Sequence, residues 1–369
     1  MQLRLLALAI SLTLTACSRA PSVTPHGREA LPDRLSAWGV VTRQGDALRL
    51  SEGVTPYDLN TPLFSDYAHK LRTVWLPPGS QAGIGEDDAV EFPVGTIISK
   101  TFYYPSGKQA GEVVKSPPES GGESLDLKQF HLVETRLLIR REDGWQAIPY
   151  VWNAEQTDAE LALAGDTQTL TLIDGANRQS FAYEVPDANQ CAGCHASNHT
   201  TRAIRPIGPK LRHLNRDYAY TGVTENQLAH WQKLGWLGEL PTPLPRNAVW
   251  NDPATGDLEA RARSYLDINC GHCHNPHGAA DTSGLFLNKA TTEMHRLGVC
   301  KAPVAAGRGS GTFDFDVVPG KPDESILSFR LGSTDPGIAM PELGRALAHT
   351  EGLELIKQWI ASLPGECHR

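Results

Sequence analysis

The chain has 369 residues, of which 40% are hydrophobic, and its formal net charge at pH 7 is −8. This length predicts two or three domains, and the apolar content is enough to build their cores. The excess of acidic side chains argues against nucleic acid as a partner, while it allows a partner protein with a basic surface.

The N-terminal residues resemble a bacterial export signal. Arg4 provides a positive charge, and the apolar run from Leu5 to Leu14 is too short to cross a membrane as a helix. The sequence LTAC, which ends at Cys17, resembles the lipobox of bacterial lipoproteins. We therefore expect a signal peptide over residues 1–16 that is removed, and a lipid anchor on Cys17. The alternative is ordinary secretion with a free Cys17 thiol.

The predicted lipoprotein would lie on the periplasmic side of a bacterial membrane. Residues 17–34 are rich in serine, proline, glycine and basic side chains, which predicts a tether rather than part of a core. The serine that follows Cys17 favours the outer membrane over the inner one.

Residues 35–186 predict a β-rich domain. Residues 94–104 have the composition of a strand, and residues 131–140 alternate between apolar and polar side chains. A turn at 142–144 leads back into a second strand over 145–152, and a similar hairpin follows. Antiparallel hairpins with one apolar face predict a β-sandwich-like domain. Its many aromatic residues are expected in the core, with a substrate-binding face as the alternative.

Two short runs, residues 191–195 and 270–274, have the pattern C-x-x-C-H. This pattern is the attachment signal for c-type haem, in which two thiols bond to the haem and the histidine ligates the iron. A zinc site with four thiolates is the alternative, but it needs no histidine after each pair. We therefore expect two covalently bound haem c groups. The attaching thiols are Cys191, Cys194, Cys270 and Cys273, and the iron ligands are His195 and His274.

The two motifs are expected to lie in separate helical modules, the first over 187–250 and the second over 251–369. Near the second motif, Asp257 can cap a helix that leads to the cysteines, and Thr350 can cap a final helix with an apolar stripe. This layout is typical of class I cytochrome c. The expected fold is therefore multidomain: an antiparallel β-sandwich-like domain followed by mainly α cytochrome c modules.

Each haem iron also needs a sixth ligand. Met340 precedes the predicted last helix, which is where class I cytochromes place a sulfur ligand, so we expect it to serve the second haem. The alternative is a methionine that only packs in its loop. The first haem has no such methionine, and its candidates are His199, His213, His230 and Met294. We expect His230, because a helix would hold it rigidly; an open sixth position is the alternative.

Two cysteines, Cys300 and Cys367, remain after the lipid and haem sites are assigned. Because the periplasm is oxidising, we expect a disulfide between them. The alternative is two unpaired thiols.

The chain resembles a family of bacterial dihaem c-type cytochromes. The stretches that carry the resemblance are 56–67, 149–153, 189–195, 207–210, 226–228, 265–276 and 340–345. The resemblance implies a periplasmic electron-transfer protein with two covalent haems, and it carries over the two C-x-x-C-H motifs and Met340. Related C-terminal modules occur fused to quinoprotein sugar dehydrogenases, which suggests a periplasmic dehydrogenase as a redox partner.

Two functions are compatible with these features. The first is a membrane-anchored electron carrier without catalytic activity of its own. The second is a dihaem enzyme, such as a cytochrome c peroxidase-like oxidoreductase, in which one haem keeps an open site with an acid/base residue above it. Because no motif identifies that residue, we expect the carrier.

Overall fold

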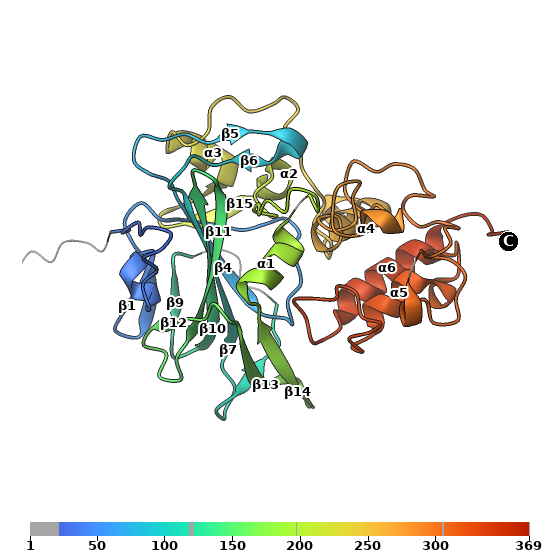
Figure 1. Cartoon of the computed structure of the whole chain (residues 1–369), viewed down its shortest axis with the longest axis horizontal. Helices are drawn as coiled ribbons and strands as arrows, with labels where there is room; N and C mark the ends of the chain where they lie inside the picture. The colour runs from blue at the N-terminus through green and yellow to red at the C-terminus, as the bar shows by residue number, and fades with distance from the viewer. Residues whose placement is uncertain (1–21, 118–121, 197, 305, 369) are drawn as a thin grey trace, which may run out of the picture.

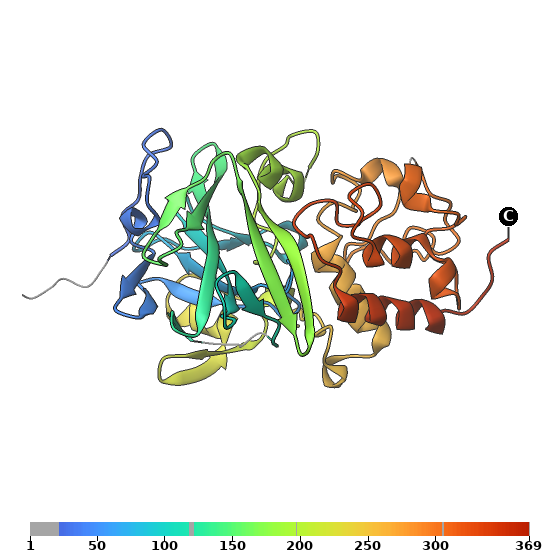
Figure 2. The same cartoon turned by 90° about the horizontal axis from the view of Figure 1, so that it is seen from below.

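The computed structural model describes residues 22–368 except 118–121, 197 and 305. A β-rich part and a smaller part with the C-terminal helices lie side by side along the longest axis, with the C-terminus at the far end (Figures 1 and 2). The predicted signal peptide and Cys17 lie outside the described residues. Among the described residues, no helix is long and apolar enough to cross a membrane.

The β-rich part is built around a six-stranded antiparallel sheet. Its strands follow the order β12-β11-β10-β7-β4-β3. Their bounds are β3 (Thr55–Tyr57), β4 (His69–Trp75), β7 (Ile97–Pro105), β10 (Phe130–Arg141), β11 (Gly144–Trp152) and β12 (Ala159–Leu161). The hairpin expected over 131–152 is thus β10 and β11, whose last pair is Arg141 with Gly144.

Smaller sheets surround this central one. One joins β1 (Val41–Gln44), β2 (Ala47–Leu50) and β9 (Ser124–Asp126). Another joins β8 (Glu112–Val114), β13 (Asp166–Asp174) and β14 (Asn177–Val185), with β8 parallel to β13. Two hairpins complete the set, β5 (Gly83–Ile84) with β6 (Val90–Glu91), and β15 (Asp217–Tyr220) with β16 (Val223–Asn226).

The described residues contain six α-helices, and all of them are short. They are α1 (Ala188–His195), α2 (Leu211–Leu214), α3 (Gln227–Lys233), α4 (Leu258–Asn269), α5 (Ile326–Gly332) and α6 (Thr350–Ser362). As expected, the Asp257 side chain caps α4 by accepting from the Ala260 N–H. The expected cap at Thr350 is wrong, because Thr350 is the first residue of α6 and His349 precedes it without a capping hydrogen bond. Six 3₁₀ helices connect other elements, at Leu35–Trp38, Glu86–Asp88, Pro253–Thr255, Asp281–Ser283, Gly307–Ser310 and Pro322–Glu324.

The expected fold class is wrong. The structure is mostly β-sheet, with 29% of residues in strands and 21% in helices, so it is not a protein of mainly α cytochrome c modules. The apolar residues of α2 and α3, such as Leu211 and Trp231, pack in one core with Val74 and Ile98 of the central sheet. Helices of one or two turns cannot bury an apolar face among themselves, so they use the sheet instead.

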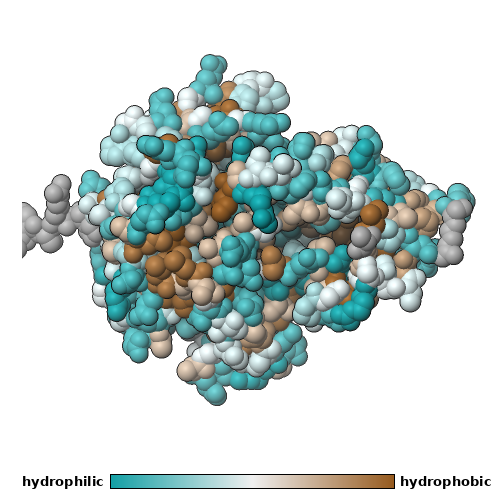
Figure 3. All heavy atoms as spheres, in the orientation of Figure 1, coloured by the Kyte–Doolittle hydropathy of each residue, from teal (hydrophilic) through white to brown (hydrophobic). Residues whose placement is uncertain are grey.

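The C-terminal part has its own apolar core, formed where α4 and α6 pack against each other. Its fully buried members include Leu266 of α4 and Trp359 of α6. On the face of the molecule in Figure 3, apolar residues form separate patches in a mostly hydrophilic surface. The β-rich part and the C-terminal part therefore have separate apolar cores. Helix α4 joins the two, because its residue Ile268 packs in the core of the central sheet.

Candidate cofactor sites

The two C-x-x-C-H motifs, distant in sequence, lie next to each other in the structure. The first occupies the end of α1, and the second follows directly after α4 (Figure 1). A capping box between Asp187 and Gln190 begins α1. The Sγ atom of Cys273 lies 3.7 Å from the carbonyl oxygen of Gly193, so the two motifs are in contact.

The four motif cysteines are free thiols that form no disulfide. Burial raises the pKa of each, to about 12 for Cys270 and Cys273, so the groups are protonated at neutral pH. Within the described part of the chain, no group of three or more His, Cys, Asp or Glu side chains is placed to hold a metal ion directly.

The second motif opens onto a cavity of about 380 Å³, here called the C-terminal cavity. This volume falls within the usual range for cofactor sites. Cys270, Cys273 and His274 line it, and Met340 lines it as well. Much of the remaining wall is apolar, and two ion pairs, Lys301 with Asp316 and Arg330 with Glu342, also line it. The expected iron ligands of the second haem, His274 and Met340, therefore face the same cavity.

His274 is held in an orientation that suits a metal ligand. Its Nδ1 lies 3.2 Å from the carbonyl oxygen of Leu285, and the residue is buried. A backbone carbonyl can only accept, so Nδ1 carries the proton and Nε2 keeps its lone pair. Burial lowers the pKa of His274 to about 4, so the ring is neutral, as a ligand must be.

The first motif opens onto a second cavity, here called the sheet cavity, between α1 and the central sheet. Its volume is about 130 Å³, smaller than that of the C-terminal cavity. Cys191, Cys194 and His195 line one side of it. Four cationic side chains of the sheet also line it, namely Lys70, Arg72, Lys100 and Arg136. Sequence inspection missed these four residues, because they lie on three strands that pair only in the folded chain.

His195 repeats the arrangement of His274. Its Nδ1 lies 2.8 Å from the carbonyl oxygen of Arg205, which again leaves Nε2 as the nitrogen with a lone pair. Burial, followed by the charge of Lys100, lowers the pKa of His195 to about 3, so this ring is also neutral. The residues of both motifs therefore fit a covalently attached haem.

The two cavities share a wall. Five residues line both of them: Cys194, Asn269, His272, Pro341 and Leu343. The loop that contains Leu343 packs closely against α1, since a Cβ atom at Gly193 would lie 3.0 Å from Cδ1 of Leu343. Groups bound in the two cavities would therefore be separated by about one layer of side chains.

The four residues considered as sixth ligands of the first haem do not line the sheet cavity. His230, the expected ligand, stacks on Tyr220 at 3.7 Å and lies 2.8 Å from the carboxylate of Glu225 through Nδ1. His213 is buried beside Asp267. The remaining two lie elsewhere, with His199 next to Asp281 and Met294 exposed. The structure therefore gives His230 other partners than a haem iron.

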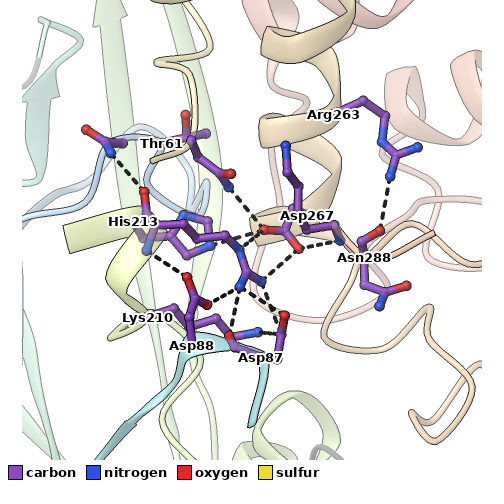
Figure 4. Close-up of polar contacts among 12 residues, drawn as sticks. Thr61, Asp87, Asp88, Lys210, His213, Arg263, Asp267 and Asn288 are labelled. Carbon is purple, nitrogen blue, oxygen red and sulfur yellow. Dashed lines mark hydrogen bonds and ion pairs between the residues drawn. The ribbon is translucent and has the colours of Figure 1, made fainter. Parts of the chain in front are cut away.

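A buried ionic network ties α4 to the β-rich part. Asp267 of α4 accepts from Arg212 at 2.9 Å and lies 3.3 Å from Nε2 of His213, both on α2. Arg212 also pairs with Asp87 and Asp88. Figure 4 shows Asp267 facing His213, with Asp87 and Asp88 close by. These partners hold the pKa of Asp267 far below its usual range, against the effect of burial. The network positions α4, and with it the second motif, against the sheet.

The loop of Met340 is held by Asp66. Both oxygens of this buried carboxylate accept from the Ala346 N–H, and Oδ1 accepts from the Leu347 N–H at 2.7 Å. Burial raises the pKa of Asp66 to about 6. Asp66 and Asp267 lie in two of the stretches that carry the family resemblance, but the sequence gives no role for either carboxylate.

Cys300 and Cys367 are joined by a disulfide with an S–S distance of 2.09 Å. It closes 67 residues of sequence. The bridge connects the residue before Lys301, which lines the C-terminal cavity, to the segment after α6. It therefore encloses the part of the chain that forms most of this cavity.

Comparisons with family models, curated proteins and solved structures found no match for this chain. The geometry of the two cavities is therefore the basis on which a function can be argued. The resemblance to dihaem cytochromes remains a prediction.

Proposed function

We propose that this chain is a dihaem c-type cytochrome that carries electrons between protein partners in the periplasm. One observation carries the proposal. The cysteines and the histidine of each C-x-x-C-H motif line a cavity, and a backbone carbonyl orients each histidine ring. A bound haem supplies an iron centre that accepts and releases one electron.

The residues of the chain would have distinct roles in this function. The two thiols of each motif would bond covalently to a haem, so the protein would retain its cofactors in the periplasm. The backbone carbonyls of Arg205 and Leu285 fix the rings of His195 and His274. We propose Met340 as the second axial ligand in the C-terminal cavity, since it lines that cavity with His274. A neutral sulfur ligand in an apolar wall favours ferrous iron.

The wall between the cavities supports transfer of electrons within one chain. A single layer of side chains separates the two sites, and a buried ionic network holds α4 against the β-rich part. Both features keep the distance between the sites short and constant. The protein could therefore accept an electron at one site and deliver it from the other.

The partners follow from the compartment and the charge. We propose that Cys17 carries a lipid anchor and that the protein works on the periplasmic side of the outer membrane. Its net charge of −8 would favour a redox partner with a basic surface, and a periplasmic dehydrogenase is one class of donor.

A dihaem peroxidase-like enzyme is the second function considered. It draws support from the sheet cavity, where Lys70 and Lys100 supply polar groups in place of a sulfur ligand. Such an enzyme needs an open or exchangeable iron site together with an acid/base residue.

Haem content and peroxide turnover test these functions. The full chain should be produced with a cytochrome c maturation system, and haem should be counted after acid–acetone extraction. We expect two non-extractable haems for each chain, reduction of both by an artificial donor, and rapid reoxidation by an added cytochrome. Fewer than two covalent haems would contradict the proposal. Rapid peroxide consumption coupled to oxidation of a cytochrome would favour the enzyme.

A further inference from the structure

Three cationic side chains lie side by side on one face of the central sheet. Arg72 of β4 pairs with Lys100 of β7, and Lys100 pairs with Arg136 of β10. Side chains at paired positions point to the same face of a sheet. Like charges opposite each other destabilise a sheet, so this row requires an explanation.

A fourth cation, Lys70, extends the row along β4. It pairs with Phe102 of β7, whose ring lies near three of the cations. The ring centroid is 5.5 Å from Nζ of Lys70, 5.1 Å from Nζ of Lys100 and 4.5 Å from Cζ of Arg136. All four cations line the sheet cavity, together with His195. They are named below as the cation row: Lys70, Arg72, Lys100 and Arg136.

Carboxylates within the protein neutralise only part of this charge. Asp58 lies 2.7 Å from Arg72, but it also pairs with Arg216. Glu134 binds Arg136 through both of its oxygens. Lys70 donates to the carbonyl oxygen of Ala68, and Lys100 has no ion pair among the described residues. Both arginines of the row therefore have a carboxylate partner, whereas neither lysine has a carboxylate within ion-pair distance among the described residues.

The two lysines of the row are partly buried, and burial makes their charged forms unfavourable. Burial, together with the charges of Arg136 and Arg72, lowers the pKa of Lys100 to about 7. The same causes lower the pKa of Lys70 well below its usual value. A buried charge without a partner is strongly unfavourable. An anion in the sheet cavity would remove that cost.

We propose that the cation row binds the two propionate carboxylates of the haem attached to Cys191 and Cys194. The inference rests on the proposed function, because it names the residues that receive one end of this haem. Two propionates carry two negative charges, one for each lysine of the row that has no carboxylate within ion-pair distance. Arginine and lysine are the usual partners of such carboxylates, since charge-assisted hydrogen bonds are the strong ones.

Lys100→Met tests the proposal, because methionine keeps the length of the side chain but removes its charge. The matched control is Lys128→Met, since Lys128 is exposed and pairs with Asp46 outside the cavity. In the dihaem protein we expect Lys100→Met to lower the midpoint potential of the first haem only, because a nearby cation favours ferrous iron. Lys128→Met should leave both potentials unchanged.

The same substitution should have the opposite effect on stability when the first haem is absent. In a chain with Cys191→Ala and Cys194→Ala, the cation row has no propionates, so Lys100→Met removes an uncompensated charge. We expect the Tm of that chain to rise by a few degrees, whereas the Tm of the dihaem protein should fall. A fall of Tm in both backgrounds, with the haem potential unchanged, would overturn the proposal and leave a structural role.

A free anion could supply the same chemistry, and inorganic phosphate distinguishes the two sources. If the propionates occupy the row, phosphate should not raise the Tm of the dihaem protein. A rise that Lys100→Met abolishes would overturn the assignment to propionates. Loss of the first haem from the unmodified protein would instead contradict the proposed function, and haem counting detects that case separately.

A different observation concerns the sixth ligand of the first haem. His272 lies inside the second motif, yet it lines the sheet cavity as well as the C-terminal cavity. Its Nδ1 is buried and has no hydrogen bond of good geometry in the described part of the chain, although the backbone of Ile268 lies near the ring. A buried ring nitrogen with so little polar contact is uncommon, because it has lost its water. His195 lines the same sheet cavity, so the two rings border one space.

We infer that His272 supplies the sixth ligand of the first haem, opposite His195. Among the residues that line the sheet cavity, His272 is the second histidine. This assignment also rests on the proposed function. It would give the first haem two imidazole ligands and make each motif contribute to both haem sites.

His272→Ala tests this ligand without altering the C-x-x-C-H pattern. We expect the first haem to lose its low-spin spectrum and to bind carbon monoxide when reduced, while two haems remain attached. His230→Ala is the matched control and should leave the spectrum unchanged. An unaltered low-spin spectrum in His272→Ala, or its loss in Lys100→Met instead, would overturn the assignment.

Discussion

The two cavities begin from the same five-residue pattern and hold its histidine in the same way, but they differ in size and in their charged side chains. In the C-terminal cavity, His274 and Met340 share a largely apolar wall whose charged side chains form ion pairs with each other. In the sheet cavity, His195 shares a wall with a row of cations from three strands, which are buried or partly buried. The reduction potential of a haem depends on its axial ligands, on burial and on nearby charge. One chain therefore offers two different environments for the same cofactor, separated by a wall of a few residues.

Removal of either cysteine pair should have the largest effect, because it should remove the haem from one cavity and leave the other haem in place. We expect Cys191→Ala with Cys194→Ala, or Cys270→Ala with Cys273→Ala, to remove one of the two haems completely. The remaining haem should keep the spectrum of its own site, which assigns each spectrum to a cavity. Mass spectrometry of the intact chain measures the haem content. Loss of both haems from one double variant would show that the two sites do not load independently.

The contact between the two regions should depend on Asp267. Replacement of Asp267 by alanine leaves His213 unpaired and Arg212 with only Asp87 and Asp88, so we expect a cost of about 3 kcal/mol, the lower end for a broken buried pair. Urea unfolding measures this loss. Asp323→Ala is the control, because Asp323 pairs with Lys357 at 2.7 Å on the surface and should cost less than about 1 kcal/mol. Equal effects of the two substitutions would contradict a structural role of the network.

Asp66 should make the stability of the Met340 loop depend on pH. Its pKa is raised to about 6 by burial, so the folded state holds the proton more tightly than the unfolded chain does. The groups that face it are Arg345 and Lys70, which lower its pKa, and Tyr104, whose hydroxyl donates to the Asp66 carbonyl. The contribution of protonated Asp66 to the free energy of unfolding is therefore full below about pH 4, and it is lost as the pH rises through about 6.

Asp66→Asn removes this titration while it keeps an acceptor for the backbone N–H groups. We expect the free energy of unfolding of the unmodified protein to fall by roughly 1–3 kcal/mol between pH 4 and pH 7 relative to the variant. Urea titrations at several pH values measure the difference. Parallel pH profiles of the two proteins would show that Asp66 does not titrate in this range.

Met340→Leu should have the smallest effect on stability, but it should still change the spectrum and the potential of the second haem alone. Leucine has nearly the same volume, so the cost should be below about 1.5 kcal/mol. We expect the far-red charge-transfer band between sulfur and ferric iron to disappear, and the potential of the second haem to fall. Met294→Leu is the control, because Met294 is exposed and lines neither cavity. A band that survives in Met340→Leu but not in Met294→Leu would reverse the assignment.

Local features of the structure could be predicted from the sequence. The alternation over 131–140 predicts a strand with one apolar face, and β10 and β11 pair as a hairpin around the expected turn. Asp257 caps α4, because a cap needs only a side chain and the next few N–H groups. Short-range chemistry of this kind depends on residues within one turn, so a pattern in the sequence is enough.

The helix around His230 shows where such patterns become insufficient. Thr224 and Gln227 have the spacing of a capping box, but Thr224 belongs to β16, and α3 begins later, with Asn226 as its cap. The ring of His230 then stacks on Tyr220 instead of facing a cavity. A strand and the start of a helix were both possible over residues 223–226. The pairing of β15 with β16 places these residues in a strand.

The haem motifs, the cap at Asp257 and the hairpin of β10 with β11 were determined by the sequence alone, because each depends on residues that are close together in the chain. The fold class, the cation row and the wall between the cavities were decided only by the tertiary structure. Lys70, Lys100 and Arg136 meet because β4, β7 and β10 pair in one register, and His272 reaches the first site because Asp267 of α4 pairs with α2, which packs on the sheet. Long-range pairing and docking depend on the packing of the whole chain, which no short pattern records.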